Sequence, residues 1–211
     1  MHIHSIPTGI FQTNCYLLSN EAKQCLIVDP GDEADVLDRY LEREGLTVIG
    51  FPTTHGHIDH VSNLAEMHRR HPAPIGLHTL DARWAFTDSN AFPPYYPAPE
   101  APSEIARDYD EGQQWDDGGM VYQVLFVPGH SPGSVAFYFE AEGVLIAGDT
   151  LFKGSIGRLD LPGGNESDMI KTLAKLLELP DDTKVYPGHG EATTIGAERK
   201  HNPFIHQYGL A

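Results

Sequence analysis

The first part of the chain alternates between apolar runs and polar breaks that separate strands from helices. Apolar runs at Asn14–Leu18 and Cys25–Val28 predict a β-hairpin. A turn at Pro30-Gly31 follows, and the apolar spacing over Glu33–Glu44 predicts a helix. Thr47–Phe51 has the composition of a buried strand and stops at a proline. The chain therefore opens with a hairpin, a helix and a further strand.

The next part resumes a helical period and ends in an irregular stretch. The pattern predicts a helix over Asp59–Arg70, a short strand at Pro74–His78 and a helix near Leu80–Phe86. Ser89–Pro102 is rich in proline and aromatic residues, so it cannot form regular structure. Long loops in compact domains are usually functional or mobile. We expect this one either to form a wall of the active-site cleft or to pack on the surface.

The second half repeats the layout. Strands are predicted at Met120–Val127, Ser134–Phe139, Val144–Ala147 and Lys184–Tyr186, and a helix at Glu166–Leu177. Two clusters of strands, each accompanied by helices, predict an α/β fold of two facing sheets flanked by helices. In such a fold the loops at one edge of the sheets converge.

Length and charge narrow the class of protein. The 211 residues suit a single domain spanning 1–211. A net charge of −16 opposes binding to nucleic acid or to an anionic membrane. The start of the sequence has no basic segment followed by an apolar one, and no stretch approaches the roughly 20 apolar residues of a membrane span. We therefore expect a cytoplasmic protein with a small-molecule substrate, and the oligomeric state stays open.

The distribution of histidine along the chain indicates a metal site. The segment HGHIDH places His55, His57, Asp59 and His60 within six residues, directly after a strand. The first two can point the same way from an extended loop, whereas the other two follow as the chain turns into a helix. Because these side chains point in two directions, the segment predicts two metal ions. Imidazole and carboxylate ligands suit Zn²⁺, Mn²⁺ or Fe²⁺, and the lack of nearby thiols argues against a closed structural zinc site.

Three further segments each place one potential ligand after a short apolar run and a glycine. They are VPGH ending at His130, IAGD ending at Asp149 and VYPGH ending at His189. Glycine lets the backbone turn sharply and brings the next side chain to the sheet edge. Any one of these histidines could be an ordinary surface or core residue, but the whole set favours a metal site. The other seven histidines lack this context and receive no metal role: positions 2, 4, 68, 71, 78, 201 and 206.

Asp29, in the segment VDPG, also ends a strand. It could simply initiate the turn at Pro30-Gly31. We favour a second interpretation, in which its carboxylate accepts a hydrogen bond from a metal-binding histidine.

The segment THGHIDH, followed in order by PGH, AGD and PGHG, resembles the metallo-β-lactamase superfamily and specifically its short glyoxalase II-like (hydroxyacylglutathione hydrolase-like) members. The resemblance implies an αβ/βα sandwich and two divalent metal ions. One ion would be bound by His55, His57 and His130, the other by Asp59, His60 and His189, and Asp149 would bridge them. Zn²⁺ is the expected metal, with Fe²⁺ and Mn²⁺ as alternatives.

The segments GDTLFKGSIGRLDLPGG and ERKHNPF resemble the same hydrolases and favour a thioester over a β-lactam substrate. The implied reaction is attack of a metal-bound hydroxide on an acyl thioester such as S-D-lactoylglutathione, with Asp59 and Asp149 as the catalytic carboxylates. Full-length glyoxalase II has an additional C-terminal helical domain for glutathione that we do not expect here, so glutathione recognition is open. Lys153 and Arg158 could meet substrate carboxylates or could be ordinary surface charges.

Two other classes remain as alternatives. Glutathione persulfide dioxygenases resemble this chain, share the segment seen here as GRLD and use one iron, but PGHG at 187–190 favours the hydrolase. A binding protein with purely structural metals is the other alternative. Within the hydrolases, lactones, other acyl esters and phosphodiesters are further candidate substrates.

Overall fold

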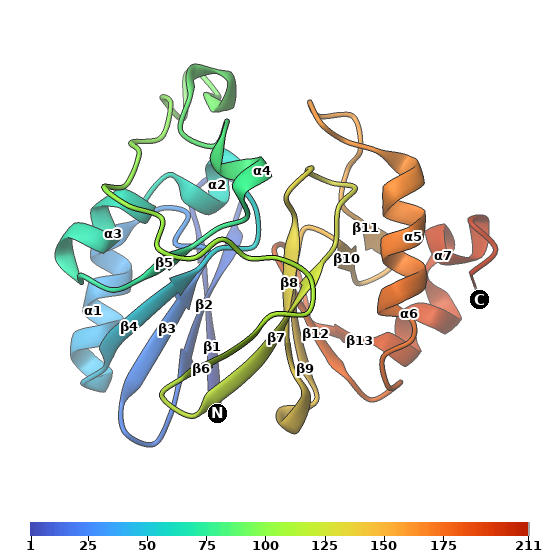
Figure 1. Ribbon diagram of the computed structural model, residues 1–211, viewed down its shortest axis with the longest axis horizontal. Helices are drawn as coiled ribbons and strands as arrows, with labels where there is room; N and C mark the ends of the chain where they lie inside the picture. The colour runs from blue at the N-terminus through green and yellow to red at the C-terminus, as the bar shows by residue number, and fades with distance from the viewer. Residues whose placement is uncertain (211) are drawn as a thin grey trace.

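The computed structural model describes residues 1–210 and consists of two facing mixed β-sheets (Figure 1). The first sheet has the order β1 (His2–Thr8), β2 (Thr13–Ser19), β3 (Gln24–Val28), β4 (Thr47–Pro52) and β5 (Ile75–Gly76). The second has the order β13 (Thr193–Thr194), β12 (Lys184–Pro187), β9 (Val144–Gly148), β8 (Val135–Phe139), β7 (Met120–Phe126) and β6 (Gln114–Asp117). The predicted arrangement of two sheets is confirmed.

Each sheet combines parallel and antiparallel pairs. In the first, β1, β2 and β3 are antiparallel neighbours, whereas β3, β4 and β5 run parallel. In the second, β12 and β9 are parallel and the remaining pairs are antiparallel. Consequently β3, β4, β9 and β12 all end at one edge of the sandwich, where the loops meet.

Helices cover the outer faces of both sheets (Figure 1). On the side of the first sheet lie α1 (Ala34–Glu44), α2 (Ile58–Val61), α3 (Leu64–Arg70) and α4 (Thr79–Ala82). On the side of the second lie α5 (Glu166–Leu176), α6 (Ile195–His201) and α7 (Pro203–Gln207). Short elements complete the chain: the 3-10 turns Asp88–Asn90 and Glu140–Glu142, and the hairpin β10 (Leu151–Phe152) and β11 (Ser155–Ile156). No helix within residues 1–210 is long and apolar enough to cross a membrane.

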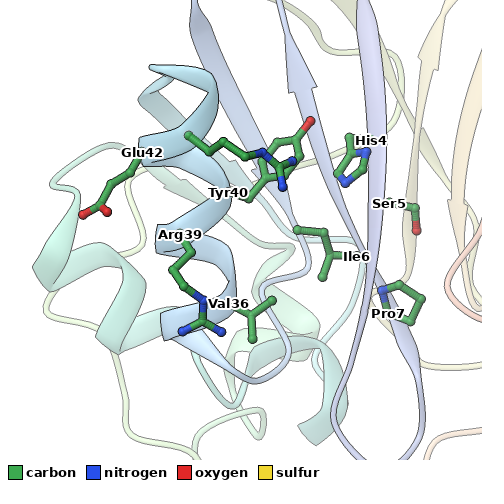
Figure 2. Close-up of a pocket in the computed structure, with 9 residues that line it drawn as sticks. His4, Ser5, Ile6, Pro7, Val36, Arg39, Tyr40 and Glu42 are labelled. Carbon is green, nitrogen blue, oxygen red and sulfur yellow. The ribbon is translucent and has the colours of Figure 1, made fainter.

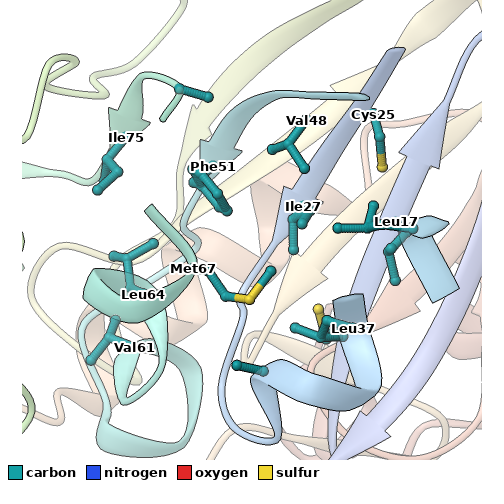
Figure 3. Packing of buried hydrophobic residues seen from close by; sticks show 14 of the residues in the cluster. Leu17, Cys25, Ile27, Leu37, Val48, Phe51, Val61, Leu64, Met67 and Ile75 are labelled. Carbon is teal, nitrogen blue, oxygen red and sulfur yellow. The ribbon is translucent and has the colours of Figure 1, made fainter. Parts of the chain in front are cut away.

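The period of two along the strands produces three apolar layers. In β2, Tyr16 and Leu18 face the second sheet and pack in one cluster with Phe137. Leu17, between them, packs instead toward α1 and contacts the cluster that contains Leu37 (Figure 3). A third cluster lies between the second sheet and α5 to α7. The nearly continuous apolar runs of the inner strands follow from this burial on both faces.

The structure corrects several predicted elements. The helix predicted over Asp59–Arg70 is two helices, α2 and α3, separated at Ser62-Asn63. The Ser62 hydroxyl hydrogen-bonds the Gly31 carbonyl, which anchors the break. The sequence pattern also missed β1, β6, β10, β11, β13, α6 and α7.

Candidate metal centre

The potential ligands all follow strands and meet at the edge where those strands end. The loop after β4 and the first turn of α2 carry His55, His57, Asp59 and His60. The second sheet contributes the others from loops after β7, β9 and β12: His130, Asp149 and His189. The site therefore lies between the two sheets and takes side chains from both.

His55, His57 and His130 form one group, in which one ligand atom from each lies within 4.8 Å of the others. The closest pair is His57 Nδ1 and His130 Nε2, at 2.8 Å. His57 is the N-cap residue of α2, so its own backbone is extended and the helix begins at the next residue, Ile58. This geometry accounts for the two directions expected from the sequence motif.

Asp59, His60 and His189 form a second group of the same size. Asp59 Oδ2 lies 3.2 Å from His189 Nε2 and 3.6 Å from His60 Nε2. The same oxygen accepts a hydrogen bond of 2.7 Å from the Thr13 hydroxyl at the start of β2. Thr13 thereby fixes the rotamer of the aspartate.

Asp149 lies between the two groups. Its Oδ2 is 3.5 Å from His130 Nε2 and 3.4 Å from His189 Nε2, and its Oδ1 is 3.5 Å from His60 Nε2. A Cβ at Gly188 would lie 2.0 Å from Asp149 Oδ1, so only glycine fits there. The glycine of the VYPGH segment is thus required by this close approach, and Gly188 does not have the left-handed backbone expected of a sharp turn.

Asp29 and Thr54 orient two of the histidines. His60 Nδ1 donates to Asp29 Oδ2 at 2.9 Å. The Thr54 hydroxyl donates to the same oxygen at 2.6 Å and therefore accepts from His55 Nδ1 at 3.0 Å. The Thr54 amide donates to Asp29 Oδ1 at 2.7 Å. Asp29 thus accepts a hydrogen bond from the candidate ligand His60, and the arrangement leaves Nε2 of both rings facing the cluster.

Backbone carbonyls orient two further rings. His130 Nδ1 donates to the Arg158 carbonyl at 2.8 Å, and His189 Nδ1 donates to the Phe11 carbonyl at 3.1 Å. A carbonyl only accepts, so each Nδ1 carries a proton and each Nε2 is the ring nitrogen left to bind a metal. Both Nε2 atoms face Asp149.

The buried polar atoms of this cluster fit divalent cations. His55 Nε2, His60 Nε2 and Asp149 Oδ1 are buried without a hydrogen-bond partner, although buried polar groups are normally satisfied. Within residues 1–210, the carboxylates of Asp29, Asp59 and Asp149 form ion pairs with histidines and with no lysine or arginine. Imidazole nitrogens together with carboxylates that no lysine or arginine neutralises are the donor set of a zinc, iron or manganese site.

The pKa values show how the cluster balances its charge without metal. Burial opposes protonation of His189, but Asp149 and Asp59 outweigh it and raise the pKa of His189 to about 9. Burial likewise opposes protonation of His60, and Asp59, Asp149 and Asp29 hold its pKa well above the ordinary value. At His57, burial and the neighbouring His130 outweigh the carboxylates of Asp59 and Asp149 and lower the pKa to about 3. In the metal-free protein, protons on His60 and His189 thus supply the positive charge that balances the carboxylates.

Sequence reasoning missed the residues that attach the His189 loop to the first sheet. The Asn14 side chain donates to the carbonyls of Pro187 and Gly190, each at 3.0 Å, and its backbone amide donates to Gly188 at 2.7 Å. The Tyr16 hydroxyl also donates to the Pro187 carbonyl, at 2.7 Å. The local sequence does not mark these contacts, because the partners are backbone groups more than 170 residues away along the chain.

The two candidate substrate cations are paired with surface carboxylates. Lys153 Nζ lies 2.5 Å from Glu191 Oε2, and Arg158 makes a two-pronged contact with Asp160 at 2.7 and 2.8 Å. All four side chains are exposed. The part of Arg158 that reaches the ligand cluster is its carbonyl, through His130.

The irregular Ser89–Pro102 loop forms an aromatic surface together with the β1–β2 turn. Phe92 contacts Phe11 with ring centroids 5.2 Å apart, and Tyr96 lies 5.9 Å from Phe11. The Ile10 amide donates to the Tyr96 hydroxyl. Phe11 and Phe92 remain 39% and 45% exposed, although the Phe11 carbonyl contacts His189. We call Ile10, Phe11, Phe92, Tyr95 and Tyr96 the aromatic wall.

A separate concavity lies on the outer side of the first sheet. It has a volume of about 940 Å³ and is lined by β1 and α1, including His4, Arg39 and Tyr40 (Figure 2). None of the candidate ligands lines it. His4 stacks on Tyr40 with ring centroids 4.1 Å apart, so this histidine packs away from the cluster, as expected from its lack of a motif.

Comparison with known proteins decides the family. The model of the metallo-beta-lactamase superfamily matches residues 8–189, the range that carries every candidate ligand. The chain belongs to the metallo-β-lactamase superfamily. The predicted αβ/βα sandwich of that superfamily is confirmed by solved structures. The chain is similar to the BLEG-1 B3 metallo-beta-lactamase, with 37% identity, coverage of 97% and 99% of the two chains and a TM-score of 0.91. It is also similar to TTHA1623 in a di-iron-bound form, with 38% identity, coverage of 95% and 99% and a TM-score of 0.85.

Curated relatives of this superfamily match over nearly their whole length. A probable metallo-hydrolase, YqgX of Bacillus subtilis, is 37% identical over 207 residues, which cover 97% of this chain and 98% of the relative. The hydroxyacylglutathione hydrolase GloC of Haemophilus influenzae is 33% identical over 208 residues, with coverage of 97% and 98%. Together with the His and Asp groups able to bind metal, these relatives support a metal-dependent hydrolase.

Proposed function

We propose that this metallo-β-lactamase-fold protein is a dinuclear hydrolase of acyl thioesters, and that glutathione thioesters such as S-D-lactoylglutathione are its substrate class. The position of Asp149 carries the proposal. Its two oxygens lie within 3.5 Å of ligands from both groups, so one carboxylate can serve two metals.

Each metal has a defined set of ligands in the proposal. His55, His57 and His130 would hold one ion, Asp59, His60 and His189 would hold the other, and Asp149 could contribute to both. When bound, such ions would polarise a carbonyl oxygen and lower the pKa of a water molecule to about 7. No serine or cysteine nucleophile is then required.

The protein's own contribution is orientation and proton handling. Asp29 fixes the protonated Nδ1 of His60, and through Thr54 that of His55, so that both Nε2 atoms stay available. Asp59 Oδ2, held by Thr13, lies at the surface of the cluster with its side chain 14% exposed. We assign Asp59 the role of orienting the attacking water and accepting its proton.

Two observations bear on the substrate. The similarity to a hydroxyacylglutathione hydrolase supports a glutathione thioester. The aromatic wall would meet the apolar part of an acyl group, while Lys153 and Arg158 could exchange their exposed carboxylate partners for those of glutathione. Exposed ion pairs contribute little to stability, so such an exchange has a low energetic cost.

The experiment that tests this proposal follows loss of the thioester absorbance of S-D-lactoylglutathione with purified protein, and in parallel follows oxygen consumption with glutathione persulfide. We expect metal-dependent thioester hydrolysis and no oxygen uptake. Oxygen uptake by protein containing one iron, without hydrolysis, would instead identify a persulfide dioxygenase.

A further inference from the structure

Asp81 is a buried carboxylate that neither the family motif nor the proposed reaction uses. It lies in the short helix α4, is 0% exposed, and forms no ion pair with any basic side chain of residues 1–210. Burial of a carboxylate is costly unless hydrogen bonds compensate it. Its hydrogen-bond donors therefore show what the residue is for.

One oxygen of Asp81 contacts the first ligand loop. Asp81 Oδ2 accepts a hydrogen bond of 2.8 Å from the amide of Gly56, the residue between His55 and His57. The Gly56 carbonyl is held from the other side, since the buried Asn90 side chain donates to it at 2.8 Å. The peptide groups between the two histidines are thus fixed at both their donor and their acceptor.

The same carboxylate contacts the loop of the second sheet. The Ser131 hydroxyl, directly after His130, donates to Asp81 Oδ2 at 2.6 Å. The Gly133 amide donates to Asp81 Oδ1 at 2.7 Å. Asp81 therefore joins the two loops that carry His55, His57 and His130, which come from different sheets.

Small residues make this approach possible. A Cβ at Gly133 would lie 2.7 Å from Asp81 Oδ1, and a Cβ at Gly56 would lie 3.1 Å from the Asp81 Cβ. Both glycines leave room for the carboxylate to reach the backbone. Contact with Asp81 therefore explains why glycine stands at position 56, between the two histidines, and at position 133, three residues after His130.

We propose that Asp81 is a positioning residue that sets the spacing of His55, His57 and His130 and thereby selectively controls metal affinity at that position. The inference rests on the proposed metal centre. The second group, Asp59, His60 and His189, is held by different contacts, from Thr13, Asp29 and the Phe11 carbonyl. Loss of Asp81 should therefore weaken one metal and spare the other.

The test is a metal titration of the metal-free full-length protein, with Zn²⁺ bound per chain measured for wild type, Asp81→Asn and Asp88→Asn. In Asp81→Asn, one carboxylate oxygen is replaced by an NH₂ group, which cannot accept a hydrogen bond from a backbone amide. The hydrogen bonds from the Gly56 and Gly133 amides therefore cannot both persist. We expect one Zn²⁺ to bind as in wild type and the other about 10–100-fold more weakly, the range for loss of a residue supporting metal ligands. Asp88→Asn makes the same charge change on the neighbouring exposed segment and should bind both ions normally.

Two backgrounds identify which ion is affected. In His189→Ala, the remaining Zn²⁺ should be weakened by Asp81→Asn, whereas in His57→Ala the addition of Asp81→Asn should change little. Equal weakening of both ions, or normal binding of both, would overturn the proposal. If Asp81→Asn does not fold by circular dichroism, Ser131→Ala provides a second test. It removes the hydroxyl that contacts Asp81 and Ser134, keeps the two backbone hydrogen bonds to Asp81, and must still weaken the same ion. Because no substrate is involved, a wild type that binds two ions but lacks thioesterase activity would refute only the proposed substrate.

Discussion

Asp149 is the residue through which the two groups of candidate ligands are joined, so its replacement tests the site assignment. Asp149→Ala removes both oxygens that lie near His60, His130 and His189. We expect bound metal to fall below one ion per chain. Activity should fall by more than the roughly 10–100-fold that loss of an outer partner costs. Elemental analysis and a thioesterase assay on the same preparation measure both.

His71→Ala is the matched control for that variant. His71, at the C-terminal end of α3, contacts Asp38 of α1 and belongs to none of the ligand groups. It should keep full metal content and activity. Normal metal and turnover in Asp149→Ala would mean that the assigned centre is wrong.

His189 provides the pH dependence of metal binding. With a pKa of about 9 in the metal-free protein, it is protonated at neutral pH, yet a ligand must offer a lone pair. Binding must release this proton, so apparent metal affinity should rise by about tenfold per pH unit for each displaced proton and level off above about pH 9. Calorimetry in buffers of different ionisation enthalpy counts the protons. Binding without proton release would contradict the assignment of His189.

The candidate ligands could be predicted from the sequence because each follows a strand in a short, recognisable segment. Asp29 could be placed for the same reason. Asp81 and Asn14 could not, since their partners are backbone groups distant in the sequence and no local spacing indicates such contacts. The pairing of Arg158 with Asp160 likewise depends on side-chain geometry that composition does not encode.

At the scale of elements, the aromatic wall predicts substrate preference. Its exposed rings adjoin His189 through the Phe11 backbone, so an acyl chain could bury its methylenes there. Each buried methylene contributes about 0.8 kcal/mol, or roughly fourfold in affinity. Across acetyl, propionyl and butyryl glutathione, kcat/KM should rise in wild type and rise less in Phe11→Ser and Phe92→Ser.

Val121→Ser serves as the control for the wall. Val121 is 49% exposed on β7, so its replacement removes a similar apolar group away from the wall. It should keep the wild-type dependence on chain length. The same dependence in the Phe11 and Phe92 variants would exclude the wall from the substrate site.

Strands buried on both faces were predictable, whereas an edge strand and most two-residue strands were not. Strands β2, β3 and β8 are buried on both faces and contain unbroken apolar runs. Strand β1 is an edge strand whose exposed side chains dilute the pattern, and β10, β11 and β13 have two residues each. The break between α2 and α3 depends on Ser62 contacting Gly31, a tertiary contact that a helical period cannot reveal.

At the scale of the whole molecule, the metals would link the two sheets. Ligands from the β4 loop and from the β7, β9 and β12 loops share each ion, so bound metal favours the folded state by mass action. We expect chelation to lower the melting temperature and added metal to restore it. A free ion at 100-fold its Kd raises the free energy of unfolding by about 2.7 kcal/mol for each site. Scanning calorimetry with and without chelator measures the shift. An unchanged melting temperature would show that the ions do not join the sheets.

The central claim is that the two ligand groups bind two metals that act together on a thioester. The most direct measurement adds metal stepwise to metal-free protein and follows metal bound per chain and S-D-lactoylglutathione hydrolysis in the same samples. The account predicts saturation at two ions per chain, with hydrolysis reaching its maximum only as the second ion binds. Saturation at one ion, or full occupancy by two ions without hydrolysis of any acyl thioester, would contradict it.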